Sequence, residues 1–135
     1  PLKGEVDLRK IKSSSYSKIA LPGCSHNKKI NYYPWLNKSL QKDIHGIPAP
    51  LNERKLEAKE ISILFVPALA IDTTGIRLGY GGGYFDSLRK DKVWRSIPSF
   101  VVIPKSCVSR IPLPRDPWDI PFDGWITEEG YTKSV

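Results

Sequence analysis

The chain has 135 residues, of which 40% are hydrophobic and 26% charged, and its formal net charge is +7. This length and composition fit one globular domain with a sizeable core. No apolar stretch approaches the length of a transmembrane helix, so we expect no membrane partner. A basic chain attracts anions, and nucleic acid is one candidate among them. Because no nucleic-acid-binding motif or long basic stripe is present, we expect no nucleic-acid partner.

Strands and helices are predicted to alternate along the chain. In order they are a helix over 5–12, strands over 16–21 and 29–35, an extended loop at 48–50, a helical turn over 52–59 begun by Asn52, a strand over 61–66, a helix over 84–89, a strand over 99–103, an irregular crossing over 104–121 and a short terminal strand over 124–127. The strand over 61–66 is almost wholly apolar, which is typical of a central strand covered on both faces. This alternation predicts an α/β fold with a mostly parallel sheet, in a single domain over 1–135.

Residues 77–86 read Arg-Leu-Gly-Tyr-Gly-Gly-Gly-Tyr-Phe-Asp, with four glycines among five residues. They lie between the predicted strand over 61–66 and the predicted helix over 84–89. Glycine adopts positive φ angles and lets a ligand approach the backbone closely. Backbone N–H groups that converge in such a loop suit a phosphate, and the planar guanidinium of Arg77 matches phosphate oxygens.

Three familiar phosphate-binding motifs do not fit this stretch. A Walker loop ends in Gly-Lys-Ser/Thr, whereas Gly83 is followed by Tyr84. A dinucleotide-binding fold needs an acidic residue after the next strand, whereas the strand over 99–103 continues into Pro104 and Lys105. A protein kinase needs a His-Arg-Asp motif, which is absent. Spacing alone therefore leaves two interpretations, an anion-binding loop of unassigned type and a flexible surface turn.

The longer string over 66–86 closely resembles the signature of the 5-formyltetrahydrofolate cyclo-ligase family, also called 5,10-methenyltetrahydrofolate synthetases. Supporting similarities follow in the same order along the chain, at 1–7, 20–22, 46–50, 118–119 and 122–128. The resemblance covers nearly the whole chain. Three positions depart from the family pattern: Ala49 stands for a glutamate, Phe85 for a tyrosine and Trp118 for a histidine.

The resemblance implies a three-layer α/β sandwich with a mostly parallel central sheet. Family members begin with a basic helix and a first strand that help to hold ATP. Since this chain starts at Pro1 and contains no methionine, we expect that helix and strand to be missing and the 135 residues alone to be a poor catalyst. The implied reaction converts 5-formyltetrahydrofolate to 5,10-methenyltetrahydrofolate: ATP phosphorylates the formyl oxygen, a folate nitrogen attacks, and ADP and phosphate are released.

The resemblance also implies the site residues. Arg77 and Tyr84 are the catalytic candidates. The candidates for ATP binding are Arg77, Leu78, Gly79, Tyr80, Gly81, Gly82, Gly83, Tyr84 and Phe85. Those for folate binding are Glu5, Tyr80, Gly81, Gly82, Gly83 and Tyr84, and those for Mg²⁺ are Asp86 and Asp119.

Each assignment has a structural alternative. Asp86 could cap a helix, Asp119 could belong to an ordinary turn, Glu5 could favour a helix N-terminus, and Tyr84 could be a core residue. For the whole protein the implied setting is a cytoplasmic monomer whose folate substrate carries one or several glutamates. The rival functions are a non-catalytic anion-binding remnant of the family and a basic nucleic-acid-binding domain.

Overall fold

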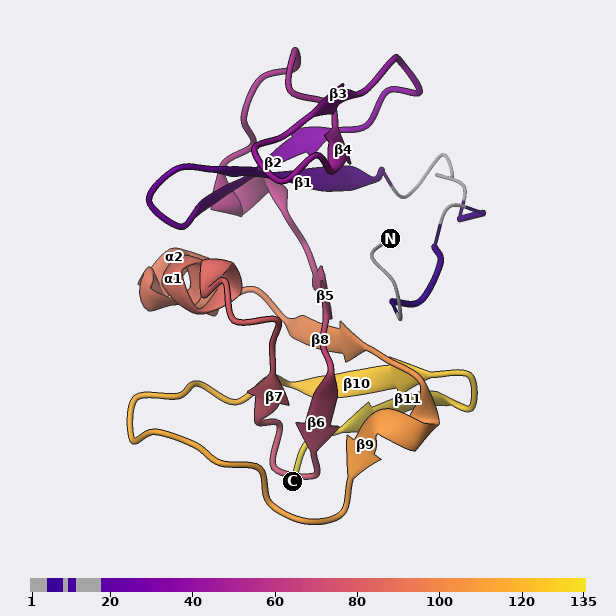
Figure 1. The fold of residues 1–135 in the computed structure, drawn as a ribbon, viewed down its shortest axis with the longest axis vertical. Helices are drawn as coiled ribbons and strands as arrows, with labels where there is room; N and C mark the ends of the chain where they lie inside the picture. The colour runs from indigo at the N-terminus through magenta and orange to yellow at the C-terminus, as the bar shows by residue number, and fades with distance from the viewer. Residues whose placement is uncertain (1–4, 9, 12–17) are drawn as a thin grey trace.

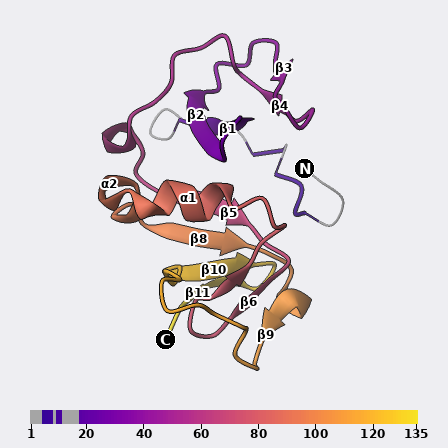
Figure 2. The same cartoon turned by 60° about the vertical axis from the view of Figure 1, so that its left-hand side comes forward.

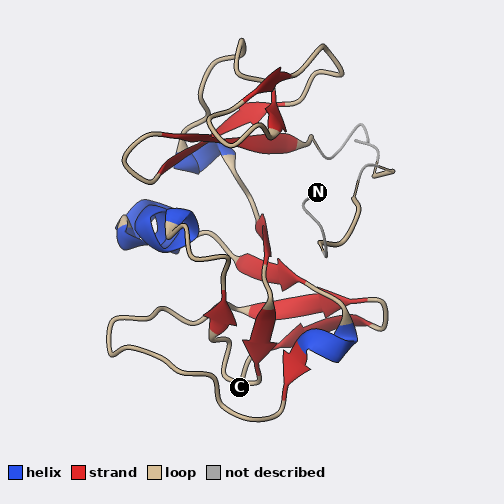
Figure 3. Cartoon of the chain, viewed as in Figure 1, coloured by secondary structure: helices blue, strands red, loops and turns tan. Residues whose placement is uncertain are grey.

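A computed structural model describes residues 5–8, 10–11 and 18–135, and Figure 3 shows how helices and strands are distributed among them. The strands are β1 (Ala20–Ser25), β2 (Lys29–Pro34), β3 (Gln41–Lys42), β4 (Pro48–Ala49), β5 (Leu64–Pro67), β6 (Ala70–Asp72), β7 (Arg77–Leu78), β8 (Ser99–Val102), β9 (Val108–Ser109), β10 (Gly124–Thr127) and β11 (Gly130–Lys133). The α-helices are α1 (Tyr84–Lys90) and α2 (Lys92–Arg95), and the 3₁₀ helices are η1 (Ala58–Glu60) and η2 (Lys105–Cys107).

The central sheet has four strands in the order β11-β10-β8-β5. Strands β5, β8 and β10 run parallel, and β11 returns antiparallel to β10 through a hairpin. The prediction of an α/β fold with a mostly parallel sheet is therefore confirmed. Helices α1 and α2 lie between this sheet and the β1–β2 hairpin (Figures 1 and 2). There Tyr32 of β2 stacks on Trp94 of α2, with ring centroids 5.8 Å apart.

A smaller sheet of order β7-β6-β9 carries the chain from the central sheet towards the glycine-rich stretch. Ile71 of β6 is fully buried and belongs to the same core as Val66 of β5, Val101 of β8 and Ile103 just after β8. Burial of such aliphatic side chains contributes about 1.5–3 kcal/mol each, so this core fixes where β7 and the following turn lie.

The strand over 61–66 was expected at the centre of the sheet, and that prediction is wrong for the described sheet. The strand that forms there, β5, starts only at Leu64 and lies at the edge of the sheet. Leu64 and Val66 are buried, whereas Phe65 between them is 47% exposed. Successive side chains of a strand point to opposite faces, so only one face of this apolar run is covered.

Other boundaries also differ from the sequence-based predictions. The expected helix over 5–12 is absent from the described residues 5–8 and 10–11, where Leu8 and Ile11 are exposed; a short helix that buries no apolar face is only marginally stable. The strand expected over 16–21 begins at Ala20 and continues to Ser25, because it pairs with β2 along its whole length. Residues 16 and 17 lie outside the described residues.

Three further segments are shorter or more ordered than expected. The helical turn over 52–59 reduces to η1, and the residue that caps it is Glu57 rather than Asn52. Within the expected loop at 48–50, Pro48 and Ala49 form β4. The strand over 124–127 is followed by β11, which the sequence did not indicate. The predictions of β2, α1, β8 and β10 are confirmed to within one residue.

No helix in the described part of the chain is long and apolar enough to span a membrane.

Candidate functional site

The turn that precedes Arg77 is stabilised by hydrogen bonds to one carboxylate. Asp72, at the end of β6, is 1% exposed and accepts hydrogen bonds from the backbone N–H groups of Thr74, Ile76 and Leu113 at 2.8–3.0 Å, and from the Thr74 hydroxyl at 2.7 Å. Burial alone would raise the pKa of Asp72, but these hydrogen bonds hold it below its ordinary value. The ionised carboxylate therefore fixes the path of the chain into β7.

The guanidinium of Arg77 is held inside the molecule. Its Nε donates to the Pro67 carbonyl at 2.9 Å, and its carbon lies 5.2 Å from the ring centre of Phe85 and 5.9 Å from that of Phe122. Burial lowers the pKa of Arg77, while Asp86, Tyr80 and Tyr32 act in the opposite direction. An arginine stays cationic even so, and a desolvated cation attracts an anion more strongly than an exposed one.

Residues Gly79–Gly83 form a tight bend between β7 and α1, called the glycine turn below. Gly81 and Gly83 have φ angles of +91° and +70°, which residues with a Cβ rarely adopt. A Cβ on Gly81 would meet nothing within 4 Å, whereas one on Gly82 would meet the ring of Tyr84 at 2.9 Å. The ring of Tyr84 therefore lies over Gly82, and the backbone at Gly81 is open to an approaching ligand.

Two residues that sequence reasoning did not assign to the site approach the glycine turn from the N-terminal strands. The Nζ of Lys28, in the β1–β2 turn, lies 3.4 Å from the position that a Cβ would take on Gly83. The Nε2 of His45, in the β3–β4 turn, lies 2.5 Å from the hydroxyl oxygen of Tyr84. No local sequence signal marks Lys28, because only the pairing of β1 with β2 brings it there.

Tyr80 connects the glycine turn to the first described residues. Burial raises the pKa of Tyr80, and the negative charge of Glu5 raises it further. The charge of Glu5 therefore acts on Tyr80, and the shared role of the two residues in one site stays a prediction. Phe85 packs under Arg77 against the core, and Leu78 is half-exposed on β7, where its carbonyl accepts the Leu69 N–H at 2.8 Å.

The two candidate metal ligands have different surroundings. Asp86 is exposed in the first turn of α1, and its side chain makes no hydrogen bond or ion pair with another described residue. It does not cap the helix, because the N-cap position belongs to Gly83. Asp119 accepts the Asp116 N–H at 2.7 Å and so stabilises a turn in the crossing over 104–121.

Arg89 joins the helix that carries Asp86 to the loop that carries Asp119. Its two terminal nitrogens donate to the carbonyls of Ile120 and Pro121, each at 2.9 Å, and its guanidinium lies 3.9 Å from the ring centre of Phe122. In the described part of the chain, no group of three or more His, Cys, Asp or Glu side chains is placed to hold a metal ion. Mg²⁺ is commonly held by one or two carboxylates together with substrate phosphates, so a site for this ion needs no group of three such side chains.

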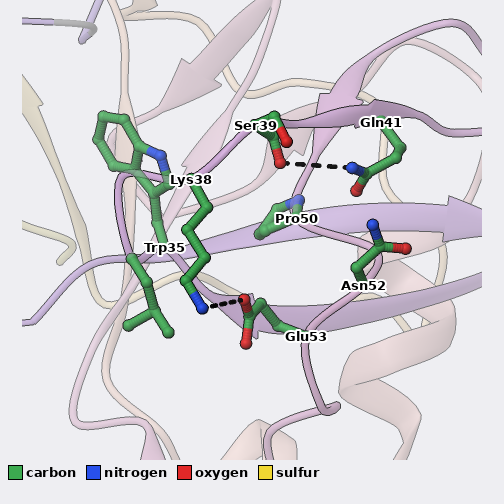
Figure 4. Close-up of a pocket in the computed structure, with 8 residues that line it drawn as sticks. Trp35, Lys38, Ser39, Gln41, Pro50, Asn52 and Glu53 are labelled. Carbon is green, nitrogen blue, oxygen red and sulfur yellow. Dashed lines mark hydrogen bonds and ion pairs between the residues drawn. The ribbon is translucent and has the colours of Figure 1, made fainter.

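Two hollows of the described surface lie elsewhere. One, of about 80 Å³, is lined by residues that include Trp35, Lys38 and Glu53, with Lys38 and Glu53 paired at 3.7 Å (Figure 4). The other, of about 780 Å³, lies beside β9, β10 and β11, and Lys105 on its wall pairs with Glu129 at 2.6 Å. Neither is lined by a residue of the glycine turn. The first is too small for a nucleotide, and on the wall of the second Lys105 already pairs with Glu129.

Fold and site together define an α/β protein with cationic side chains at both ends of a glycine turn. The model of the 5-formyltetrahydrofolate cyclo-ligase family matches residues 8–128, and the chain belongs to that family. A 5-formyltetrahydrofolate cyclo-ligase of Haemophilus influenzae is 37% identical over 97 residues, which are 69% of this chain and 49% of the relative. A mitochondrial 5-formyltetrahydrofolate cyclo-ligase of Arabidopsis thaliana is 32% identical over 158 residues, covering 93% of this chain and 55% of the relative.

A solved structure shares the fold. It is a 5,10-methenyltetrahydrofolate synthetase from Mycoplasma pneumoniae, with a TM-score of 0.68 and 19% sequence identity over 96% of this chain and 70% of that one. The chain spans about half the length of the curated relatives it matches.

Proposed function

We propose that the protein catalyses the ATP-dependent conversion of 5-formyltetrahydrofolate to 5,10-methenyltetrahydrofolate, with release of ADP and phosphate. Membership of the cyclo-ligase family supports this reaction. The structural observation that carries it is the placement of two cations, Arg77 against Gly79 and Lys28 against Gly83, at the two ends of one open glycine turn. Phosphoryl transfer depends mainly on positioning and on neutralising charge, and such a turn supplies both.

ATP is the ligand that we assign to the glycine turn. The exposed backbone at Gly81 leaves room for phosphate oxygens to approach, and Arg77 and Lys28 neutralise their charge from either side. Tyr80 and Tyr84 lie beside the backbone of the glycine turn, Leu78 precedes the turn and Phe85 follows it.

Asp86 is the carboxylate that we assign to Mg²⁺. It is exposed, is one turn away from Gly83 along α1, and has no hydrogen bond or ion pair with another described residue, so both of its oxygens are available. Asp119 is a second ligand in this proposal, through the oxygen that does not accept the Asp116 N–H. Magnesium prefers such hard oxygen ligands, and when bound it would neutralise charge on the ATP phosphates.

The folate is assigned to the Tyr80 side of the turn, where the charge of Glu5 also acts. A carboxylate accepts hydrogen bonds from the amino and ring N–H groups of a pterin, and a tyrosine ring offers a stacking surface. This places the formyl group near Arg77 and Tyr84, the two residues that we propose to be catalytic. For the whole protein we further propose a single cytoplasmic domain that acts as a monomer and accepts folates with or without a polyglutamate tail.

The reaction can be followed directly, because the methenyl product has a near-ultraviolet absorbance of its own. The assay should use the protein with any residues encoded upstream of Pro1, since the relatives are about twice as long. We expect an absorbance increase that requires both ATP and 5-formyltetrahydrofolate. ATP binding without this increase would favour the non-catalytic remnant, and the absence of both would refute the proposal.

A further inference from the structure

His45 and Tyr84 are 39 positions apart in the sequence but form one polar contact. The Nε2 of His45 and the hydroxyl oxygen of Tyr84 are 2.5 Å apart, and the two rings meet edge to face, with centroids at 5.3 Å and an interplanar angle of 88°. The contact links the β3–β4 turn to the first residue of α1, and so to the glycine turn.

The β3–β4 turn holds His45 in place through the carboxylate of Asp43. One oxygen of Asp43 accepts the backbone N–H groups of His45 and Ile47 at 2.8 and 3.0 Å, and the other accepts that of Cys24 at 2.9 Å. Burial alone would raise the pKa of Asp43, but these N–H groups hold it below its ordinary value. An exposed histidine is thus presented on a backbone with little freedom to move.

Tyr84 is fixed from the opposite side. Its ring carbons lie 2.9 and 3.0 Å from the position that a Cβ would take on Gly82, so the ring rests directly on the glycine backbone. With the ring on Gly82 and the hydroxyl on His45, the position of the hydroxyl oxygen beside the glycine turn is determined.

We propose that His45 is a positioning residue for Tyr84: its Nε2–H donates to the Tyr84 hydroxyl oxygen, which leaves the hydroxyl proton free for an anionic oxygen of the ligand. This inference rests on the proposed binding of ATP at the glycine turn. Phosphate oxygens only accept hydrogen bonds. A Tyr84 hydroxyl whose proton was already donated to His45 could not also donate to them. The His45 tautomer with Nε2 protonated is therefore the one that allows Tyr84 to donate to a phosphate oxygen.

Two substitutions separate this role from simple ring packing. His45→Phe keeps an aromatic ring beside Tyr84 but has no donor, whereas His45→Gln keeps an N–H donor and loses the ring. Calorimetric titration with ATP should show about tenfold weaker binding for His45→Phe. This is the loss expected when one hydrogen bond is removed from a series that links His45, Tyr84 and a charged phosphate oxygen. His45→Gln should bind within about twofold of the unaltered chain. His26→Phe, at the other histidine of the chain, is the matched control and should bind normally.

Tyr84→Phe completes a double-mutant cycle. Because Tyr84 is the group through which His45 acts, Tyr84→Phe should weaken ATP binding at least as much as His45→Phe, and the double variant should be no weaker than Tyr84→Phe alone. Nitrogen NMR of the two imidazoles gives a readout independent of affinity. In the complex with ATP, His45 Nε2 should have the chemical shift of a protonated nitrogen, and Tyr84→Phe should move this signal but not those of His26.

The outcomes distinguish this inference from the proposed function. If the unaltered chain binds ATP and His45→Phe binds it equally well, or if His45→Gln fails as badly as His45→Phe, the inference is overturned and the proposed function stands. An unprotonated Nε2 in the ATP complex overturns it as well. These titrations use the protein with any residues encoded upstream of Pro1, and if that unaltered, folded protein does not bind ATP at all, both are overturned. Near-ultraviolet circular dichroism of each variant confirms that it is folded.

Discussion

The guanidinium of Arg77 occupies the space beside Gly79 that the side chain of any other residue would need. Its two terminal nitrogens lie 2.6 and 2.9 Å from the position of a Cβ on Gly79, closer than real Cβ atoms approach other groups. A side chain at position 79 would therefore have to displace the arginine, and this close approach is what favours glycine there, since no unusual φ angle is involved at Gly79. The arginine and the glycine form one structural unit, and it lies at the start of the proposed phosphate site.

Gly79→Ala tests this unit. The added methyl group should displace the Arg77 guanidinium, weaken ATP binding about tenfold or more and lower the free energy of unfolding by about 1–3 kcal/mol. Gly130→Ala is the control: Gly130 has a φ of +113° but nothing within 4 Å of its Cβ position, so this change should cost stability and leave ATP binding intact. Calorimetry and denaturant titration measure both quantities. Equal ATP affinity in folded Gly79→Ala would contradict the proposed role of Arg77.

Lys28→Met tests the cation at the other end of the glycine turn. The substitution keeps most of the apolar stem and removes the charge, so ATP affinity should fall several-fold, and its dependence on salt concentration should become weaker. Lys29→Met, one position along, is the matched control, because it makes the same change on the neighbouring exposed side chain, at the first residue of β2. Identical losses of ATP affinity in the two variants would show that ATP binding depends on the overall charge of the chain and not on the position of Lys28.

Asp86→Asn tests the proposed metal ligand. The variant should need a higher Mg²⁺ concentration for tight ATP binding and should keep its melting temperature, because the N-cap of α1 is Gly83 and Asp86 makes no capping bond. Asp91→Asn serves as a comparison at a true cap, where the side chain accepts the Val93 N–H at 2.8 Å. ATP titrations at several Mg²⁺ concentrations decide the matter. A lower melting temperature with unchanged Mg²⁺ dependence would make Asp86 a structural residue.

Asp72 makes stability depend on pH in a predictable direction. Its pKa in the folded chain is lower than the ordinary value of 3.8, so its stabilising effect is complete above that value and is lost as the pH falls through the folded pKa. Asp72→Asn should lower the free energy of unfolding by about 1–3 kcal/mol at pH 7, because a buried acceptor of four hydrogen bonds is altered. At pH 3 the difference from the unaltered chain should be smaller. Denaturant titrations at both pH values measure it, and a difference that grows on acidification would contradict this assignment.

The glycine turn could be predicted from sequence because its chemistry is local. Glycines between a strand and a helix, preceded by Arg77, fit either an anion-binding loop or a flexible surface turn, and the resemblance over 66–86 favours the first. Helix α1 and strand β8 could also be predicted, because their patterns are short and self-contained. The edge position of β5 could not be predicted, because a run of apolar residues does not show whether one or both faces are covered.

Lys28 and His45 were missed for a different physical reason. Both are exposed residues in turns, and each reaches the site only through strand pairing between segments distant from residues 77–86. For His45 a local signal did exist: an aspartate two residues earlier and a glycine directly after it are typical of a turn stabilised by an Asx hydrogen bond. That signal predicts a fixed turn, but it cannot predict that Tyr84 lies opposite.

The measurement that tests the central claim most directly combines two readouts on one sample. The protein, with any residues encoded upstream of Pro1, is mixed with ATP, Mg²⁺ and 5-formyltetrahydrofolate, and methenyl absorbance and released phosphate are recorded together. We predict that both rise at the same rate and in equal amounts, that neither rises when ATP or the folate is left out, and that Arg77→Met slows both equally. Phosphate release without methenyl formation, or methenyl formation without ATP, would contradict the account.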